Sequence, residues 1–173
     1  MLHLENEILD RLRGAGALAP GVRVFSAADL AGAAQNFQFT PAVHVVFSGY
    51  RVRRNTANNF LAEVEQTWLT VAAARSARDQ QGGGAARGGA SDLTEALFGL
   101  MAGWLPEGAC APFALADAPG ASFDQGVFYI PMAWRTMVEL SRDAEDGFPL
   151  LKRVTAEHGI GETQEIPAEE TAA

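Results

Sequence analysis

The stretch LAEVEQTWLTVAAARSARDQQGGGAARGGASDLTEALFGLMAGWL, residues 61–105, contains the three elements around which the rest of the chain is organised. Its first part, from Leu61 to about Ala74, predicts a long strand, because polar and apolar residues alternate at first and small apolar residues follow. This change is typical of a strand that runs from a half-exposed edge into a covered interior. The last part, Ser91–Leu105, predicts a helix with Ser91 or Asp92 as its N-cap. Its apolar stripe consists of Leu93, Leu97, Leu100, Met101 and Trp104.

The segment between them, Arg75–Ala90, predicts an exposed and flexible arm. It contains five glycines and three arginines but no large apolar side chain that would anchor it in a core. Loops longer than about 12–15 residues inside a compact domain are usually functional or disordered. We therefore expect the arm to be mobile alone and to become ordered only through contacts with another molecule.

The remaining segments predict an α+β fold with the order α-β-α-β-β-α-β-β. A turn-rich connection at 53–59 joins strands 42–53 and 61–74 into an antiparallel hairpin. Pro131 in the last strand predicts an edge position or a bulge. The result is a mixed, mostly antiparallel sheet packed by helices. The other predicted elements are a helix at 3–13, a strand at 22–25, a helix at 27–35 capped by Ser26, a strand at 109–118 broken by Pro112, a turn region at 118–125 and a strand at 126–140.

The sequence predicts that the chain has two parts, an α+β domain at 1–140 and an acidic C-terminal extension at 141–173. The extension has eight acidic residues against three basic ones, a local charge of −5. Residues 148–154 predict a short docked segment, and the chain after about Gly159 predicts disorder, because it is acidic and poor in aromatic residues.

Composition narrows the class of protein. The 173 residues are 48% hydrophobic with a net charge of −8, as expected for a soluble globular domain with no bulk attraction to nucleic acid. No apolar run approaches the roughly 20 residues of a membrane-spanning helix. The acidic first twelve residues do not resemble a signal peptide. The single cysteine excludes an intramolecular disulfide, so we expect a protein that stays in a reducing cytoplasm or is assembled there.

The histidines and the cysteine predict neither a metal site nor a nucleophile. His3, His44 and His158 lie far apart in the chain, whereas metal ligands cluster at characteristic spacings. His44, inside a strand, is interpreted as a structural residue with its hydrogen bonds satisfied. Cys110, two residues before Pro112, is interpreted as a small core side chain.

The glycine-rich run GGGAARGG, residues 82–89, lies between a strand and a helix, where phosphate-binding loops occur. It lacks the Lys and Ser/Thr of a P-loop and the context of a dinucleotide-binding motif. We therefore predict no catalytic, cofactor-binding or metal-binding residues.

Arginines are concentrated in the middle of the chain. Between residues 51 and 87 there are six arginines against three acidic residues, a local charge of +3 in an acidic protein. Together with the −5 extension, this predicts surfaces of opposite sign, which head-to-tail assembly with itself or with stacked partners would use. The candidate assembly residues are Arg51, Arg53, Arg54, Arg75, Arg78 and Arg87.

The chain resembles the tail terminator family of tailed bacteriophages, in its Mu-like prophage branch. The resemblance spans roughly residues 2–140 and brings no active-site residues with it. It is carried by LENEILDRLR (4–13), GVRVFSAADL (21–30), TPAVHVVFSGYRV (40–52) and, most of all, WLTVAAARSARDQQGGGAARGGASDLTEALFGLMAGWLP (68–106).

The resemblance implies a ring, usually hexameric, that caps the tail tube, ends its polymerisation and provides the head–tail joining surface. The implied partners are the chain itself, the tail tube protein, the tail sheath and the head–tail connector, with no membrane, no cofactor, and DNA at most passing through the ring. The implied location is the virion tail, after assembly in the bacterial host cytoplasm.

The alternative is a small cytoplasmic enzyme or ligand-binding domain that uses the glycine-rich loop as a lid or an anion site. Native mass and the neighbouring genes would distinguish the two.

Overall fold

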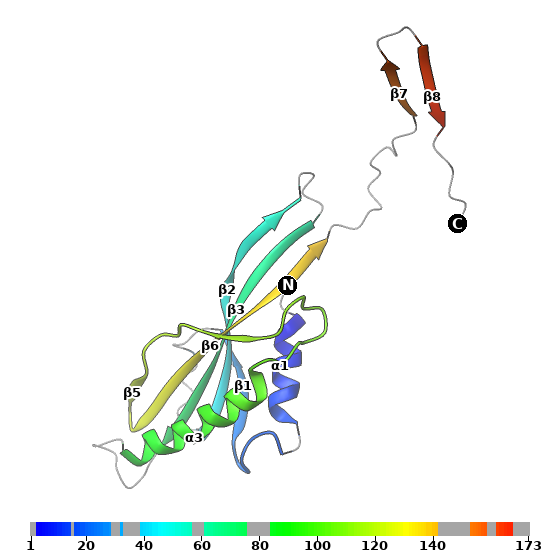
Figure 1. Ribbon diagram of the computed structural model, residues 1–173. Coiled ribbons are helices and arrows are strands. Elements are labelled where there is room, and N and C mark those ends of the chain that lie inside the picture. The colour runs from blue at the N-terminus through cyan, green and yellow to red at the C-terminus, as the bar shows by residue number, and fades with distance from the viewer. Residues whose placement is uncertain are drawn as a thin grey trace. The chain divides into compact units, whose positions relative to one another are not determined.

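The fold is described by a computed structural model, which describes residues 3–14, 16–28, 32, 39–56, 61–75, 84–141, 153–158 and 162–167. The chain divides into two units, Met1–Ser141 and Arg142–Ala173. Within its described residues, the first unit contains a mixed, mostly antiparallel six-stranded sheet with the helices α1 and α3 packed on it, which confirms the α+β class (Figure 1).

The sheet is built around β3 (Leu61–Arg75). Strands β2 (Ala42–Asn55) and β6 (Val127–Ser141) lie antiparallel on either side of it over almost its full length. Strand β1 (Arg23–Ala27) pairs in parallel with the first part of β2, and the short strands β4 (Ala114–Ala116) and β5 (Ser122–Asp124) pair with the outer edge of β6. The predicted long strand and hairpin are therefore confirmed.

Burial along β3 follows its sequence pattern. Its first residues are half-buried on alternate positions, and every residue from Trp68 to Ala74 is buried. Trp68 lies directly opposite Trp134 of β6, and both indoles are fully buried. Trp68 Nε1 donates to Gln66 Oε1 (3.0 Å) and Trp134 Nε1 donates to Thr70 Oγ1 (2.9 Å), so each polar edge is satisfied inside the core.

The two helices, α1 (His3–Arg13) and α3 (Gly84–Met101), contribute to one core on the Trp68 face of the sheet. We call this the helix-bearing face. Arg11 Nε of α1 donates to the carbonyl of Leu100 (2.6 Å), which ties the two helices together. The helical side chains of this core are Leu4, Ile8, Leu9, Leu12, Leu93, Leu97 and Met101.

Helix α3 begins seven residues earlier than predicted. Ser91 and Asp92 lie inside the helix and are not its N-cap, so the second half of the predicted arm is helical. Ala86 and Ala90 are fully buried. Gly89 lies so close to β3 that a Cβ added to it would be 3.4 Å from the Ala74 side chain. Small residues allow this close approach to β3, and the packing outweighs the poor helix propensity of glycine. The rest of the predicted arm, 76–83, lies outside the described residues.

The opposite face of the sheet carries a second buried cluster, which includes Val46, Leu69, Val71 and Tyr129. The predicted helix at 27–35 starts incorrectly, because Ala27 belongs to β1. Ser26 is also part of that strand and hydrogen-bonds through its hydroxyl to the Glu5 carboxylate of α1, so it is not a helix cap. Residues 29–31 and 33–38 lie outside the described residues.

Pro131 lies in a strand that is not at the edge of the sheet, and the β3–β6 register passes it without a bulge. On the outer side of β6, β5 pairs with residues 127–129 and β4 with residues 133–135, so Pro131 falls in the gap between them. There its missing N–H costs no ladder hydrogen bond. The predicted strand at 109–118 is reduced to β4 and an Ala109–Val138 bridge, while β5 lies in the predicted turn region.

The second unit contains an antiparallel pair, β7 (Arg153–His158) and β8 (Glu162–Pro167). The sequence predicted disorder after about Gly159, whereas Glu162–Pro167 forms a strand. Four β-branched residues in these segments favour extended backbone, and this preference outweighs the acidic, aromatic-poor composition. They are Val154, Thr155, Thr163 and Ile166. Most of the predicted docked segment, 148–152, lies outside the described residues.

His44 is fully buried, but it is not the satisfied residue that the sequence predicted. Its ring stacks on Phe25 with centroids 5.5 Å apart, and within the described part of the chain neither ring nitrogen has a hydrogen-bond partner. Desolvation by burial lowers its pKa below the ordinary value near 6.5. His44 is thus held neutral in an apolar setting, where a protonated ring is unfavourable.

This predicts a pH-dependent loss of stability that replacing His44 by leucine removes. The unfolded chain binds a proton near pH 6.5 and the folded chain only at lower pH, so stability is full above about pH 6.5 and falls as pH drops towards the folded-state pKa. The slope cannot exceed about 1.4 kcal/mol per pH unit. Urea unfolding at pH 7.5 and 5.5 measures it, with the exposed His3→Gln variant as control. An unchanged slope in His44→Leu would contradict the prediction.

Candidate assembly interface

One end of the sheet extends beyond the helices (Figure 1). We call it the distal ribbon; it comprises residues 47–55 of β2, 61–66 of β3 and 136–141 of β6. Strand β1 pairs with β2 only as far as Val46. Within the described residues, the outer edge of β2 from Phe47 to Asn55 therefore has no neighbouring strand, and such an edge is open to pairing with another chain.

Two register shifts decide which side chains face which way along this edge. They lie between Phe47 and Gly49 and between Val52 and Arg54, and Gly49 adopts a φ of 128° that favours glycine. After the first shift, Tyr50 lies opposite Gln66 and Val52 lies opposite Val64. Gln66 and Val64 lie two and four residues before Trp68, and so on the same face of β3. Tyr50 and Val52 are therefore placed on the helix-bearing face.

The opposite face of the ribbon carries charge. Arg51 lies opposite Glu65 and Arg54 opposite Glu63. Arg53 Nη2 is 2.6 Å from Glu65 Oε2, and Arg54 forms an ion pair with Glu63. These pairs are partly exposed and contribute at most about 1 kcal/mol each to stability. Arg51 is exposed and forms no ion pair with any described residue, so its guanidinium is available to a partner.

Arg135 of β6 completes this charged face, with its Nε 3.9 Å from Glu65 Oε1. The arginines surround a shallow hollow of about 320 Å³. Three guanidinium groups and one carboxylate line it, so the hollow suits an acidic group of another molecule. Its lining residues are Ser48, Gly49, Tyr50, Arg51, Arg53, Glu65, Thr67 and Arg135.

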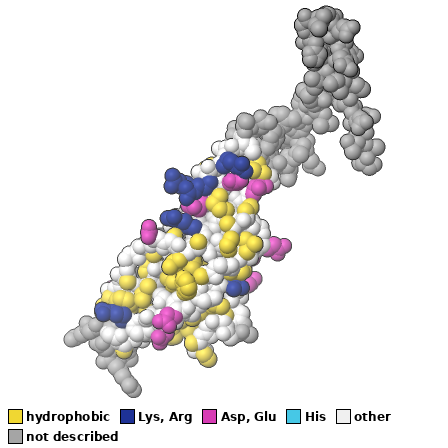
Figure 2. Space-filling view, viewed as in Figure 1, with side chains coloured by type: hydrophobic (Ala, Val, Ile, Leu, Met, Phe, Trp, Pro, Cys, Tyr) yellow, Lys and Arg dark blue, Asp and Glu magenta, His cyan; other side chains and the backbone are white. Residues whose placement is uncertain are grey.

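The six arginines singled out in the sequence do not form one cluster. Arg51, Arg53 and Arg54 come together in the distal ribbon, where Figure 2 shows basic and acidic side chains gathered. Arg75 is exposed at the other end of β3, ten residues beyond the partner of Arg51 and twelve beyond that of Arg54, which is roughly 33–40 Å along the strand. Arg87 lies on α3 with its guanidinium 5.4 Å from the Phe128 ring. Arg78 lies outside the described residues.

Sequence reasoning missed Tyr50 and Val52 of the ribbon and Arg135 beside it. The alternation of Arg135, Met137 and Glu139 with buried residues of the last strand was a signal for a polar face near the arginines. Tyr50 and Val52 had no such signal, because their orientation depends on the bulge before them.

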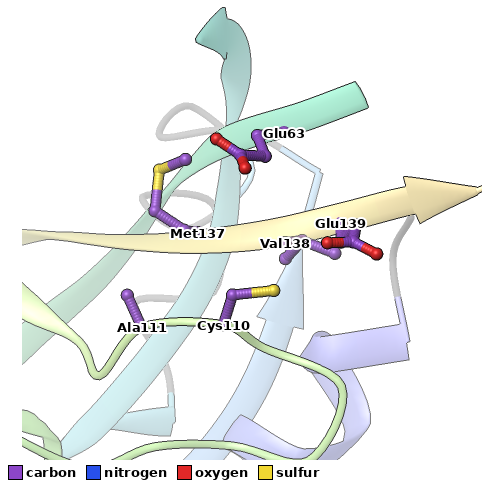
Figure 3. Close-up of a pocket in the computed structure, with 6 residues that line it drawn as sticks. All are labelled: Glu63, Cys110, Ala111, Met137, Val138 and Glu139. Atoms are coloured by element: carbon purple, nitrogen blue, oxygen red, sulfur yellow. The ribbon is translucent and has the colours of Figure 1, made fainter. Parts of the chain in front are cut away.

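A second hollow, of about 230 Å³, lies beside the ribbon (Figure 3). Cys110 lines it and is exposed, so its interpretation as a core side chain was wrong. The Cys110 backbone N–H donates to the Met137 carbonyl (2.7 Å), and the side chain lies at the outer edge of β6. Glu63, Glu139 and Met137 also line this hollow. No group of three metal-ligating side chains occurs in the described residues.

The fold and this surface define an α+β protein whose sheet ends in an uncovered, charged ribbon suited to contacts with other chains. The described residues contain no helix long and apolar enough to cross a membrane. The model of the family Phage tail terminator protein matches residues 5–145, and the chain belongs to that family. It is therefore a structural component of a phage tail, as the resemblance implied. Among curated proteins, no match was found.

Proposed function

We propose that the protein forms a ring, most simply a hexamer, that caps the tail tube, ends its polymerisation and provides the surface for head–tail joining. Family membership supports a role among tail components. The observation that carries the ring is the distal ribbon, an unpaired strand edge with three arginines on β2. A closed ring would cover this edge, which a monomer exposes to non-specific pairing.

The same geometry weakens the enzyme or ligand-binding alternative. As a lid, the glycine-rich run would have to move, but Gly84–Ala90 is helical and packs Ala86 and Ala90 against the sheet. These residues are not free to close over a ligand. We therefore propose a structural role without catalysis or a cofactor.

Further parts of the proposal follow from the family resemblance. The partners are the tail tube protein, the sheath and the head–tail connector, with DNA at most passing through the ring. Assembly takes place in the host cytoplasm, and the Mu-like branch is the proposed origin.

Removing the gene from its phage and supplying it in trans tests the proposal. Without the protein, we expect tails of uncontrolled length and heads lacking joined tails; with it, electron microscopy should show one ring at each tube end. The ring should have a mass near 110 kDa, about six times the 18.3 kDa chain. Normal tails without the protein, or a single copy at the tube end, would contradict the proposal.

We also propose that residues 1–141 fold without the acidic extension. Ending the chain after Ser141 leaves the six-stranded sheet and its core complete. The melting temperature should therefore fall by less than about 2–4 °C, which corresponds to about 1 kcal/mol at this size. Ending it after Thr136 instead removes buried Val138 and should cause a larger drop. Equal losses from both truncations would show that the extension contributes to the fold.

A further inference from the structure

The described large apolar residues that are exposed include two groups at opposite edges of the sheet. Tyr50 (55% exposed) and Val52 (48%) lie on the distal ribbon at the β2 edge. The second group comprises Phe98 of α3 (49%), Leu115 of β4 (53%) and Phe123 of β5 (41%). A sheet with apolar residues on both edges has the two unlike surfaces that a head-to-tail contact requires.

The second group lies along the β6 side of the sheet, and we call it the acceptor edge: Phe98, Leu115 and Phe123 with the half-buried Ile130 and Met132. Leu115 pairs with Trp134, and the Phe98 ring is 6.3 Å from the same indole. Phe123 pairs with Phe128 further along β6, again at 6.3 Å. Figure 2 shows hydrophobic side chains over this region of β5 and β6.

Strand β2 and the acceptor side of the sheet also differ in charge, although Glu63, Glu65 and Glu139 balance the three arginines within the distal ribbon as a whole. Residues 42–56, which include all of β2, have three arginines and no acidic residue, a charge of +3. Residues 84–126, from α3 through β5, have one arginine and five acidic residues, a charge of −4. Glu95 is three residues before Phe98 and thus beside it on α3, and Asp117 follows β4; both are exposed. Acidic groups therefore border the apolar acceptor edge, while the arginines of β2 lie on the opposite face of the ribbon from Tyr50 and Val52.

We propose that the distal ribbon of one protomer binds the acceptor edge of the next, so that this heterologous contact closes the ring. Tyr50 and Val52 pack against Phe98 and Leu115 on the helix-bearing face, and Arg51, on the other face of the ribbon, pairs with Asp117, which follows β4 at the edge of the sheet. This inference rests on the proposed ring. The sequence had suggested that the arginines meet the acidic extension, whereas here their partner is the folded domain of a second copy of the chain.

The arrangement is sterically consistent. Both apolar groups lie on the helix-bearing face, because Tyr50 is opposite Gln66 and Leu115 is opposite Trp134. Two sheets placed edge to edge with the same face outward therefore bring these groups to the same side. The nine ribbon residues of β2 span about 30 Å, enough to cross a neighbouring edge. The ribbon and acceptor edge are offset along the strands, so ring closure needs strands inclined to the ring axis, as in a barrel.

Cysteine pairing tests the contact. In a Cys110→Ser background, which has no other cysteine, Tyr50→Cys and Leu115→Cys are combined in one full-length chain. Under mild oxidation, with the tail tube as template where needed, we expect intermolecular disulfides and a ladder that ends at the ring copy number. Mixing a Tyr50→Cys chain with a Leu115→Cys chain should give covalent dimers only.

Leu105→Cys in place of Leu115→Cys is the matched control, since Leu105 is equally exposed (54%) but lies outside the acceptor edge. It should give less than a tenth of the cross-linked product. Equal cross-linking with this control, or dimers from Tyr50→Cys alone, would overturn the inference while leaving the ring intact. If the unmodified protein forms no ring even on tubes, the proposed function itself fails, and that result is distinguishable.

Discussion

Replacing Trp68 by alanine is expected to lower the free energy of unfolding by about 3–5 kcal/mol, a large part of the stability of a domain of this size. Trp68 is fully buried at the centre of β3, opposite Trp134 and with the Phe47 ring 4.9 Å from its own. The substitution leaves a cavity between the helices and the sheet and removes a donor from Gln66 Oε1. Urea unfolding followed by circular dichroism measures the change.

Phe98→Ala provides the control for this prediction. Phe98 is 49% exposed on α3, so its loss should cost far less than the loss of Trp68. Similar destabilisation by the two variants would mean that the paired tryptophans are not the centre of the core. Trp68→Phe should recover part of the loss, because it refills most of the cavity.

Replacing Arg51, Arg53 and Arg54 together by glutamine is expected to prevent ring closure while leaving the fold intact. Their partly exposed ion pairs add little to stability, but a charge-assisted hydrogen bond desolvated at an interface contributes about 1.5–3 kcal/mol. Losing even one such bond weakens each protomer contact at least about tenfold. Native mass spectrometry and the length distribution of tails would show the loss, and thermal unfolding would show the intact fold.

Arg75→Gln combined with Arg87→Gln is the matched control at the other end of the sheet. Arg87 is on α3 over Phe128, next to the acceptor edge, where its positive charge does not attract an arginine-bearing ribbon. This control should therefore form rings at least as well as the natural sequence. If it abolishes rings and the ribbon variant does not, the protomer contact depends on Arg75 or Arg87 and the distal ribbon does not make it.

The sequence by itself determined the elements whose cause is local. Helix 3–13, the long strands and the antiparallel hairpin follow from hydrophobic periodicity and turn residues, which act over a few neighbours along the chain. Leu93, Leu97 and Met101 were recognised as core residues for the same reason. The α+β class followed from the order of these elements.

Only the tertiary structure decided features whose cause lies far away in the chain. The start of α3 depends on the packing of Ala86 and Ala90 against β3, which outweighs the glycines around them. Whether Tyr50 points to the helix-bearing face depends on a one-residue bulge, because one residue of slip exchanges the two faces of a strand. Charge counts along the sequence grouped Arg54 with Arg87, but the length of β3 separates them, since charge interacts through space and not along the chain.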